Sequence, residues 1–363
     1  MLLFNPEHDL CLANGDSNYV PPLSALKFGQ DCAAIMEWIA DKEKRITPWG
    51  WNPYIRKRLS LKGIPDEELP SSREIAQIRE LSHRKVALEA NEYIHNHIQS
   101  PYIERVDIIV AHDLSAIADI LKKWHNAVAK APLSGSGKGL RWLRDGEFSV
   151  QDAGWCKRTI TRQGYVMVER RHRVIQDFAM LFHIGKDVSF EGYSLFFTDN
   201  AIYKSNLLAP DHAIASILSS YFPNGLLEDI RDCLTCFLKM RFCGHYTGYT
   251  GVDMFVYDDG DGYRVQPCVE INVRMTMGLL ARKVYDRIMT GDIPQGASAT
   301  DQGLLSCLRV SNAAYPIMQV EYSPAPKALK SATDRAIYHL TNVTSSSNYA
   351  IAIFQGKANN RNE

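Results

Sequence analysis

The sequence predicts an α+β protein, because helical and strand periodicities occupy different stretches of the chain. Apolar residues at helical spacing are prominent in the first 95 residues. Beyond residue 127, short apolar segments separated by polar turns follow one another, as in antiparallel sheets. A DDGDG turn joins two such segments within residues 251–274 and is a strong hairpin signal. We therefore expect helices first and a sheet-rich centre after them.

The N-terminal region, residues 1–95, is expected to form an α/β domain. Residues 2–5 (LLFN) are a short apolar strand that leads into a polar loop. A helix is expected at residues 22–40, where apolar side chains recur near a 3.6-residue period: Leu23, Leu26, Cys32, Ile35 and Ile39. After the turn-rich residues 46–54, a long helix is expected at residues 72–98, opening after Ser71 or Ser72, with apolar side chains Ile75, Ile78, Leu81, Val86 and Ile94.

The central region, residues 96–290, is expected to be dominated by strands. A strand at residues 103–111 and a helix at residues 113–125 open this region. Apolar segments then predict strands at residues 127–131, 140–145, 164–171, 177–185 and 193–199, helices at residues 211–222 and 226–242, and the two hairpin strands. Residues 291–363 mix helical and polar stretches and are treated as a C-terminal extension without assigned elements.

Composition and charge exclude several classes of protein. The 363 residues correspond to about two to three domains, and 45% hydrophobic with 23% charged residues excludes a disordered chain, a collagen and a coiled coil. Lys plus Arg and Asp plus Glu both number 41, whereas dedicated nucleic-acid proteins usually carry a basic excess. No run reaches the apolar length of a membrane helix, and Pro6 interrupts any signal-peptide core. We expect a cytoplasmic protein whose eight cysteines are mostly buried thiols.

A loop rich in small residues, LSGSGKG, follows an apolar strand that ends near Lys130. Glycines allow a close approach of the backbone, so that N–H groups can contact phosphates. The spacing is not that of a Walker A loop, because Pro132 and Gly139 occupy positions that require Gly and Ser or Thr. The loop suits a hairpin lid over a nucleotide; the ordinary alternative is a flexible exposed turn. Its candidate binding residues are Ser134, Gly135, Ser136 and Gly137.

The hairpin of residues 251–274 carries a candidate magnesium site. Glu270 and Asn272 alternate with apolar residues and therefore face one side of their strand, and Arg274 follows with the same parity. The hairpin can bring Asp253 onto that face. Two carboxylates and an amide are oxygen donors of the kind that Mg²⁺ prefers. The ordinary alternative is an amphipathic hairpin with one polar face.

Three weaker signals each have a functional interpretation and an ordinary structural one. Glu169, at the end of an apolar strand, could face an adenine amino group or belong to a surface charge cluster. His8 and Asp9 could bind substrate or be ordinary loop polar groups. A zinc site could be formed by four residues that are more simply explained as parts of a packed helix and its surroundings: Cys233, Cys236, Cys243 and His245.

In their order along the chain, these segments resemble the ATP-grasp superfamily: residues 82–85 (SHRK) at a helix start, residues 127–139 with the glycine-rich loop, residues 164–171 and the hairpin of residues 251–274. The resemblance covers about residues 80–285. It implies an ATP-grasp fold, in which two α+β subdomains clasp ATP, with a hinge near residues 164–178. Residues 1–95 resemble the α/β domain that precedes such folds.

Residue by residue, the resemblance implies a set of site residues. ATP would be bound by Lys85 and Lys130 at the phosphates, Glu169 near adenine, Asp177 near the ribose (with Gln176 as the alternative), Lys204, and the loop residues 134–137. The magnesium ligands would be Asp253, Glu270 and Asn272, and the catalytic residues Arg274 and Lys130. One departure concerns ligases of the D-alanine–D-alanine type, which have an arginine where this chain has Gly251.

The function that the resemblance implies is a ligase dependent on ATP and Mg²⁺ or Mn²⁺. It would activate a small-molecule or peptide carboxylate as an acyl phosphate, join it to an amine or another nucleophile, and release ADP. Neither nucleic acid nor membrane is an expected partner, and a homodimer is the usual oligomeric state. The alternatives are a different ATP-grasp reaction, such as carboxylation or transfer to a thiol, and a non-catalytic nucleotide-binding or regulatory protein with the same fold.

Overall fold

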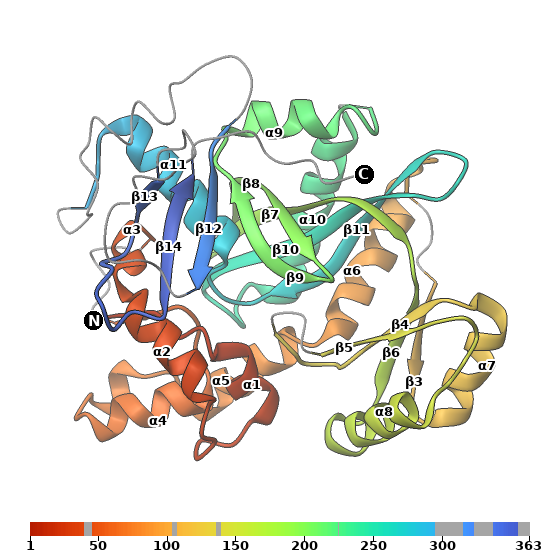
Figure 1. The fold of residues 1–363 in the computed structure, drawn as a ribbon, viewed down its shortest axis with the longest axis horizontal. Helices are drawn as coiled ribbons and strands as arrows, with labels where there is room; N and C mark the ends of the chain where they lie inside the picture. Colours follow the sequence, from red (N-terminus) through yellow and green to blue (C-terminus); the bar gives the residue numbers. More distant parts are fainter. Residues whose placement is uncertain are drawn as a thin grey trace.

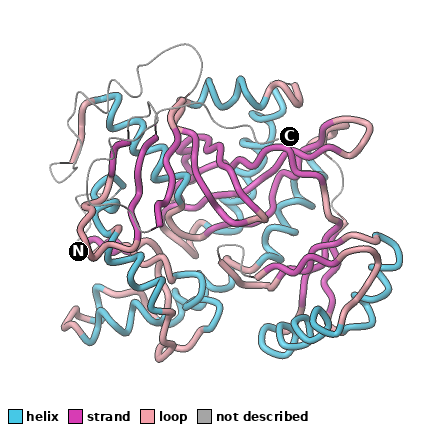
Figure 2. Tube along the Cα trace, viewed as in Figure 1, coloured by secondary structure: helices cyan, strands magenta, loops and turns pink. Residues whose placement is uncertain are grey.

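A computed structural model describes residues 1–39, 46–103, 107–135, 139–223, 225–294, 315–322 and 337–354. Strands in these ranges form a two-stranded, a four-stranded and an eight-stranded sheet, with helices packed around them (Figures 1 and 2). The α+β class predicted from the sequence is confirmed. No helix in the described ranges has both the length and the apolar character needed to span a membrane.

The N-terminal region is mostly helical. A minimal parallel sheet, β1 (Leu2–Leu3) and β2 (Thr47–Pro48), is its only strand pairing among the described residues. The helix expected at residues 22–40 is divided into α2 (Leu23–Asp31), the 3₁₀ turn η1 (Ala33–Ile35) and α3 (Met36–Ile39). The remaining helical elements are α1 (His8–Asn14), α4 (Pro53–Leu61), η2 (Asp66–Glu68) and α5 (Ser72–Leu81).

The single long helix expected at residues 72–98 is wrong, because the chain forms α5 and then α6 (Arg84–His97). The backbone of His83 is extended, with φ −67° and ψ 137°, which interrupts the helix. The hydroxyl of Ser82 donates to the Ile78 carbonyl at the end of α5. The first amide of α6, that of Arg84, donates to the carbonyl of Pro132 in the segment that leads into the glycine-rich loop. The break therefore docks the start of α6 against that segment.

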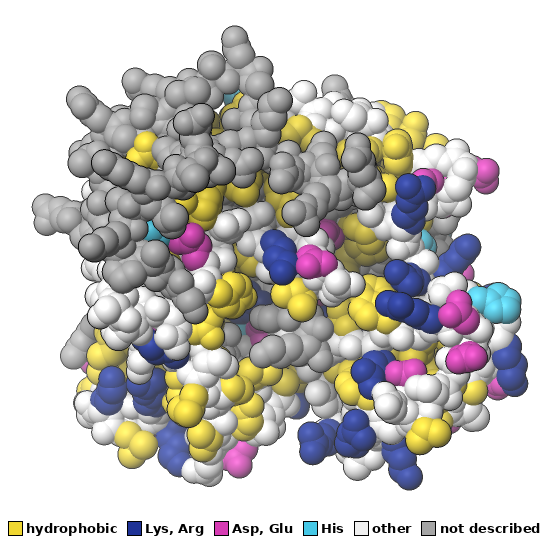
Figure 3. Space-filling view, viewed as in Figure 1, with side chains coloured by type: hydrophobic (Ala, Val, Ile, Leu, Met, Phe, Trp, Pro, Cys, Tyr) yellow, Lys and Arg dark blue, Asp and Glu magenta, His cyan; other side chains and the backbone are white. Residues whose placement is uncertain are grey.

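The four-stranded sheet forms a separate lobe (Figure 1). Its strands are antiparallel in the order β3-β6-β4-β5, and α7 and α8 pack against it around a common apolar cluster. The elements are β3 (Ile108–Ala111), α7 (Leu114–Trp124), β4 (Ala127–Lys130), β5 (Leu140–Leu143), α8 (Val150–Gln163) and β6 (Val166–Arg170). In the space-filling view an indentation separates this lobe from the N-terminal helices (Figure 3). Strand β6 ends at Arg170, two residues before β7 of the large sheet begins at Arg173.

The eight-stranded sheet is the centre of the molecule. Its order is β11-β10-β7-β8-β9-β12-β14-β13, and all neighbouring pairs are antiparallel. The strands are β7 (Arg173–Ile184), β8 (Val188–Asp199), β9 (Ile202–Leu207), β10 (Gly248–Asp258), β11 (Tyr263–Asn272), β12 (Ile317–Tyr322), β13 (Ile337–His339) and β14 (Tyr349–Phe354). Three strands therefore come from the region that the sequence left without assigned elements.

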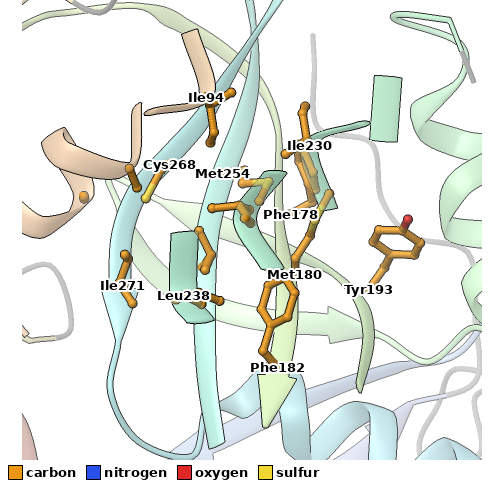
Figure 4. Packing of buried hydrophobic residues seen from close by; sticks show 14 of the residues in the cluster. Ile94, Phe178, Met180, Phe182, Tyr193, Ile230, Leu238, Met254, Cys268 and Ile271 are labelled. Carbon is orange, nitrogen blue, oxygen red and sulfur yellow. The ribbon is translucent and has the colours of Figure 1, made fainter. Parts of the chain in front are cut away.

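Alternation along the central strands separates two faces of this sheet. Phe178, Met180 and Phe182 of β7 join a large apolar cluster with α6, α9 (Asp211–Leu218) and α10 (Gly225–Phe242) (Figure 4). The intervening Leu181 packs on the opposite face, in a second cluster with α3, β14 and α11 (Met277–Thr290). The polar residues of the hairpin share this opposite face, because Asp253 is paired with Ala179.

The division of the chain at residue 95 stays a prediction. Helix α6 extends past this position, and Asn91 on α6 donates a hydrogen bond to the carbonyl of Cys268 in β11. Helix α6 is therefore joined across the predicted boundary to a strand of the sheet-rich region.

Candidate functional site

A cavity of about 330 Å³ lies against the second face of the large sheet. Its walls come from widely separated parts of the chain: the hairpin β10–β11, strands β8 and β9, α1 and the glycine-rich loop. Among the residues expected to form a site, those that line it are Asp9, Gly135, Lys204, Asp253, Glu270, Asn272 and Arg274. The magnesium candidates and two nucleotide candidates, Gly135 and Lys204, thus share one cavity.

The hairpin brings the expected magnesium ligands together. Asp253 and Glu270 are directly opposite each other in the register of β10 and β11. A β-bulge follows Asp253, and such bulges redirect side chains next to active sites. Asn272 Nδ2 donates a hydrogen bond to Asp253 Oδ2 at 2.9 Å. The shared face expected from the strand period is present; the role of these residues as metal ligands stays a prediction.

The Asp253 carboxyl has a strongly shifted pKa. Burial is the largest cause, and the Glu270 charge adds to it; together they raise the pKa of Asp253 to about 7, against the hydrogen bond from Asn272. Two facing, partly buried carboxylates are stabilised by a divalent cation, and the accompanying amide oxygen is a hard donor as well. The side chains present therefore fit Mg²⁺ or Mn²⁺.

Arg274 connects the hairpin to the N-terminal region. Its Nε and Nη2 donate to the two carboxylate oxygens of Asp9, both at 2.7 Å, and Nη2 also donates to Asn272 Oδ1 at 2.8 Å. Burial opposes ionisation of Asp9, but the charge and hydrogen bonds of Arg274 outweigh it and hold the pKa of Asp9 below its ordinary value. Asp9, at the start of α1, is therefore an ionised part of the site.

Lys130 and Glu169, both expected to contact ATP, form an ion pair with each other. They come from the adjacent strands β4 and β6 and are only 5% and 7% exposed. The charges of both residues, and those of Asp253 and Glu270, act on the thiol of Cys268, whose pKa is raised mainly by its burial. Both partners of the buried pair therefore belong to the four-stranded sheet of the lobe.

Arg84, the residue before Lys85, contacts both the glycine-rich loop and the hairpin. Arg84 donates to the Ala131 carbonyl at 3.1 Å and to Ser134 Oγ at 3.2 Å, and its Nη2 lies 3.0 Å from Glu270 Oε2. Lys85, the expected phosphate contact, is exposed. Successive residues on a helix differ in direction by about 100°, so only one of the two cations can face the hairpin. In the sequence, the basic segment SHRK indicated a cation at this helix start, but it did not show whether Arg84 or Lys85 would face the hairpin.

The expected ribose ligand, Asp177, lies on the same sheet face as Asp253. Its carboxylate accepts a hydrogen bond from Thr198 Oγ1 at 2.7 Å, and burial raises its pKa to about 6. The alternative, Gln176, donates to the carbonyls of Asp177 and Phe196. Thr198 and Lys204 both line the cavity. Asp177 is thus better placed than Gln176 to face a ligand.

The described part of the glycine-rich loop touches the N-terminal region. A Cβ on Gly135 would lie 2.4 Å from Asp9 Cβ, closer than any side chain tolerates. A glycine is therefore required where the loop meets Asp9. Two further expected loop ligands, Ser136 and Gly137, lie outside the described residues.

The zinc alternative is wrong for the four residues considered. Cys236 is exposed on α10, and the partly buried Cys233 packs at the edge of the large apolar cluster. In the ranges that the structure describes, no three His, Cys, Asp or Glu side chains form a group that could hold a metal. The candidate magnesium site on the hairpin is a different kind of group, because only two of its members, Asp253 and Glu270, are carboxylates and the third, Asn272, is an amide.

No family model matches the chain, and no curated protein matches its sequence. Among solved structures, biotin carboxylase from Campylobacter jejuni, in complex with β,γ-ATP, superposes with a TM-score of 0.51 at 11% identity, over 86% of this chain and 71% of that one. The chain has the ATP-grasp fold.

A second solved structure is similar to a smaller extent. N5-carboxyaminoimidazole synthetase from Staphylococcus aureus, complexed with ADP, has a TM-score of 0.46 at 11% identity, over 80% of this chain and 70% of that one. Within the ATP-grasp fold of this chain, the buried Lys130–Glu169 pair belongs to the four-stranded lobe. The hairpin carboxylates belong to the large sheet.

Proposed function

We propose that this protein is an ATP-dependent ligase that activates a carboxylate and joins it to an amine or another nucleophile. One observation carries the proposal: two carboxylates and an amide of a single hairpin line a cavity and contact two arginines. Phosphoryl transfer depends mainly on positioning and on neutralisation of charge. The ATP-grasp fold is consistent with this chemistry.

The proposed reaction has two steps. A carboxylate oxygen of the substrate attacks the γ-phosphorus of ATP, the bond between that phosphorus and the β,γ-bridging oxygen breaks, and ADP leaves. The nucleophile then attacks the acyl carbon, phosphate leaves, and the nucleophile loses a proton. In this scheme ADP and phosphate are the products beside the new amide or ester.

The residues have distinct roles in the proposal. Asp253, Glu270 and Asn272 would hold Mg²⁺ or Mn²⁺, which neutralises charge on the β- and γ-phosphate oxygens when bound. Lys130, released from Glu169, would contact phosphate, and Glu169 would then be available to the adenine amino group. Asp177 and Lys204 would contact the ribose and the phosphates.

Exclusion of water matters for an acyl phosphate, because water hydrolyses it. The glycine-rich loop is the element proposed to cover the intermediate. Arg84 contacts Ser134 at the start of this loop and Glu270 on the hairpin, and thereby ties the loop to the hairpin. The loop and the phosphate-binding groups would act together as the lobe approaches the sheet.

Calorimetric titration with a non-hydrolysable ATP analogue, with and without Mg²⁺, tests the nucleotide site. Magnesium-dependent binding of about one analogue per chain is expected, and absence of binding at millimolar concentration would contradict the proposal. Carboxylates are then screened for ADP release in the presence of hydroxylamine, which traps acyl phosphates as hydroxamates. Binding without any ADP release or hydroxamate would favour the non-catalytic alternative.

A further inference from the structure

The contact between Asp9 and Arg274 joins residues that are 265 positions apart. Asp9 belongs to α1, in the N-terminal region, and Arg274 follows β11. The contact is bidentate, with both distances at 2.7 Å, which is the strongest geometry for an arginine and a carboxylate. A contact of this kind holds the plane of the guanidinium in one orientation.

Nearly all N–H groups of the Arg274 guanidinium donate to an acceptor in the protein. Four of its five N–H groups have acceptors: two on Asp9, one on Asn272 Oδ1 and one on the Met275 carbonyl at 3.0 Å. The positive charge of Arg274 is thus already matched by a carboxylate. In this arrangement the side chain is suited to orient its neighbours rather than to receive a free anion.

Asn272 is oriented by its two neighbours. An arginine can only donate hydrogen bonds. Arg274 therefore requires the amide oxygen of Asn272, and this orientation turns the NH₂ group of Asn272 toward Asp253, in agreement with the two contacts at 2.8 and 2.9 Å. A continuous chain of hydrogen bonds runs from Asp9 through Arg274 and Asn272 to Asp253.

We propose that Asp9 is a positioning residue for the metal-binding hairpin, acting through Arg274 on the orientation of Asn272 and Asp253. This inference rests on the proposed function of the hairpin. It assigns part of the site to the N-terminal region, which lies before the segments that resemble the ATP-grasp pattern. Because Asp9 also contacts Gly135, the same carboxylate is placed to relate the glycine-rich loop to the hairpin.

The test is the substitution Asp9→Asn, which preserves size and removes the charge. Mn²⁺ binding to the nucleotide-free protein is followed by electron paramagnetic resonance, and calorimetry measures the Mg²⁺ dependence of binding of the ATP analogue. Loss of a charge-assisted contact predicts an increase of about tenfold to a hundredfold in the Mn²⁺ dissociation constant. Asp16→Asn, at an exposed carboxylate near the end of the same helix, is the matched control and should leave both readouts unchanged.

The double variant of Asp9→Asn with Arg274→Gln separates positioning from general damage. If Asp9 acts through Arg274, the double variant binds Mn²⁺ as weakly as Arg274→Gln alone, because Asp9→Asn has no further effect once Arg274 is replaced. Independent, multiplying effects, or Mn²⁺ binding by Asp9→Asn equal to that of the unaltered protein, would overturn the inference. Thermal unfolding of each variant identifies a loss of fold.

Failure of the underlying function has a different signature. If the unaltered protein binds neither Mn²⁺ nor the ATP analogue, the proposed function fails and the inference with it. If it binds both and Asp9→Asn binds both equally well, only the positioning role is overturned.

Discussion

Arg84 and Glu270 form an ion pair at 3.0 Å that joins the first turn of α6 to the hairpin strand β11. Arg84 is only 6% exposed, and it also contacts Ser134 in the glycine-rich loop. One guanidinium therefore links the loop, the helix start and a proposed metal ligand. This arrangement leads to the first prediction.

Arg84→Ala should weaken binding of the ATP analogue by about tenfold to a hundredfold, because a charge-assisted contact near the phosphates is lost. The neighbouring Lys85→Ala is the matched control, since its side chain is exposed, and should change the dissociation constant by less than about twofold. Calorimetric titration of both variants measures the difference. The reverse result would return the phosphate contact to Lys85.

Glu270→Gln should abolish most substrate-dependent ADP release and leave the fold intact. The change removes one of two facing carboxylates, and with it a charge that raises the pKa of Asp253. Circular dichroism checks the fold, and a coupled assay measures ADP. Glu92→Gln, at an exposed position on α6, is the control. Normal turnover by Glu270→Gln would remove this residue from the metal site.

Lys130→Ala should reduce both stability and nucleotide binding. It leaves the buried Glu169 carboxylate without its partner, which typically costs about 3–5 kcal/mol in the free energy of unfolding. Combining Lys130→Met with Glu169→Leu should restore stability but not binding, since buried ion pairs can often be replaced by apolar pairs. Urea denaturation and calorimetry measure the two quantities. If the paired replacement binds the ATP analogue normally, neither residue belongs to the nucleotide site.

His8 should make stability depend on pH. His8 is 1% exposed, and its burial lowers the pKa from 6.5 to about 4, against the opposing charge of Asp9. As pH falls, the unfolded chain binds this proton first. The stabilisation from the neutral ring is therefore complete above pH 6.5 and is lost as pH falls from there toward 4, by about 3 kcal/mol in total.

The variant His8→Gln tests this titration, because glutamine carries no proton to gain. The difference in free energy of unfolding between unaltered protein and variant should decrease by about 2 kcal/mol when the pH is lowered from about 7.5 to 4.5. Urea denaturation at the two pH values measures the difference. His212→Gln, at an exposed position on α9, is the matched control. A constant difference for His8→Gln would contradict the prediction.

Contacts that follow from the alternation of side chains along a strand, or from one tight hairpin turn, were predictable from the sequence. The common face of Asp253 and Glu270 was predictable because alternation along two strands and a tight turn determine it. The bidentate contact of Asp9 and Arg274 was not predictable, because it depends on how α1 docks on the hairpin. Strand alternation carries no information about such docking.

The break between α5 and α6 was missed for a related reason. Apolar residues continue near the helical period across Ser82 and His83, so the sequence favours one helix. The interruption is stabilised by the Arg84 amide on the Pro132 carbonyl, a long-range contact. The same break determines that Arg84, and not Lys85, faces the hairpin.

The pairing of β9 with β12 has a consequence for biosynthesis. The four-stranded lobe is complete once Arg170 has been made, and its strands can pair as soon as they leave the ribosome. Strand β9 ends at Leu207, and the strand that pairs with its free edge, β12, begins only at Ile317. Until then the nascent sheet carries an uncovered strand edge, which is a site for mispairing with other chains. The late strand β12 thus closes this edge, and the interval before it emerges is when edge-to-edge mispairing is most favoured.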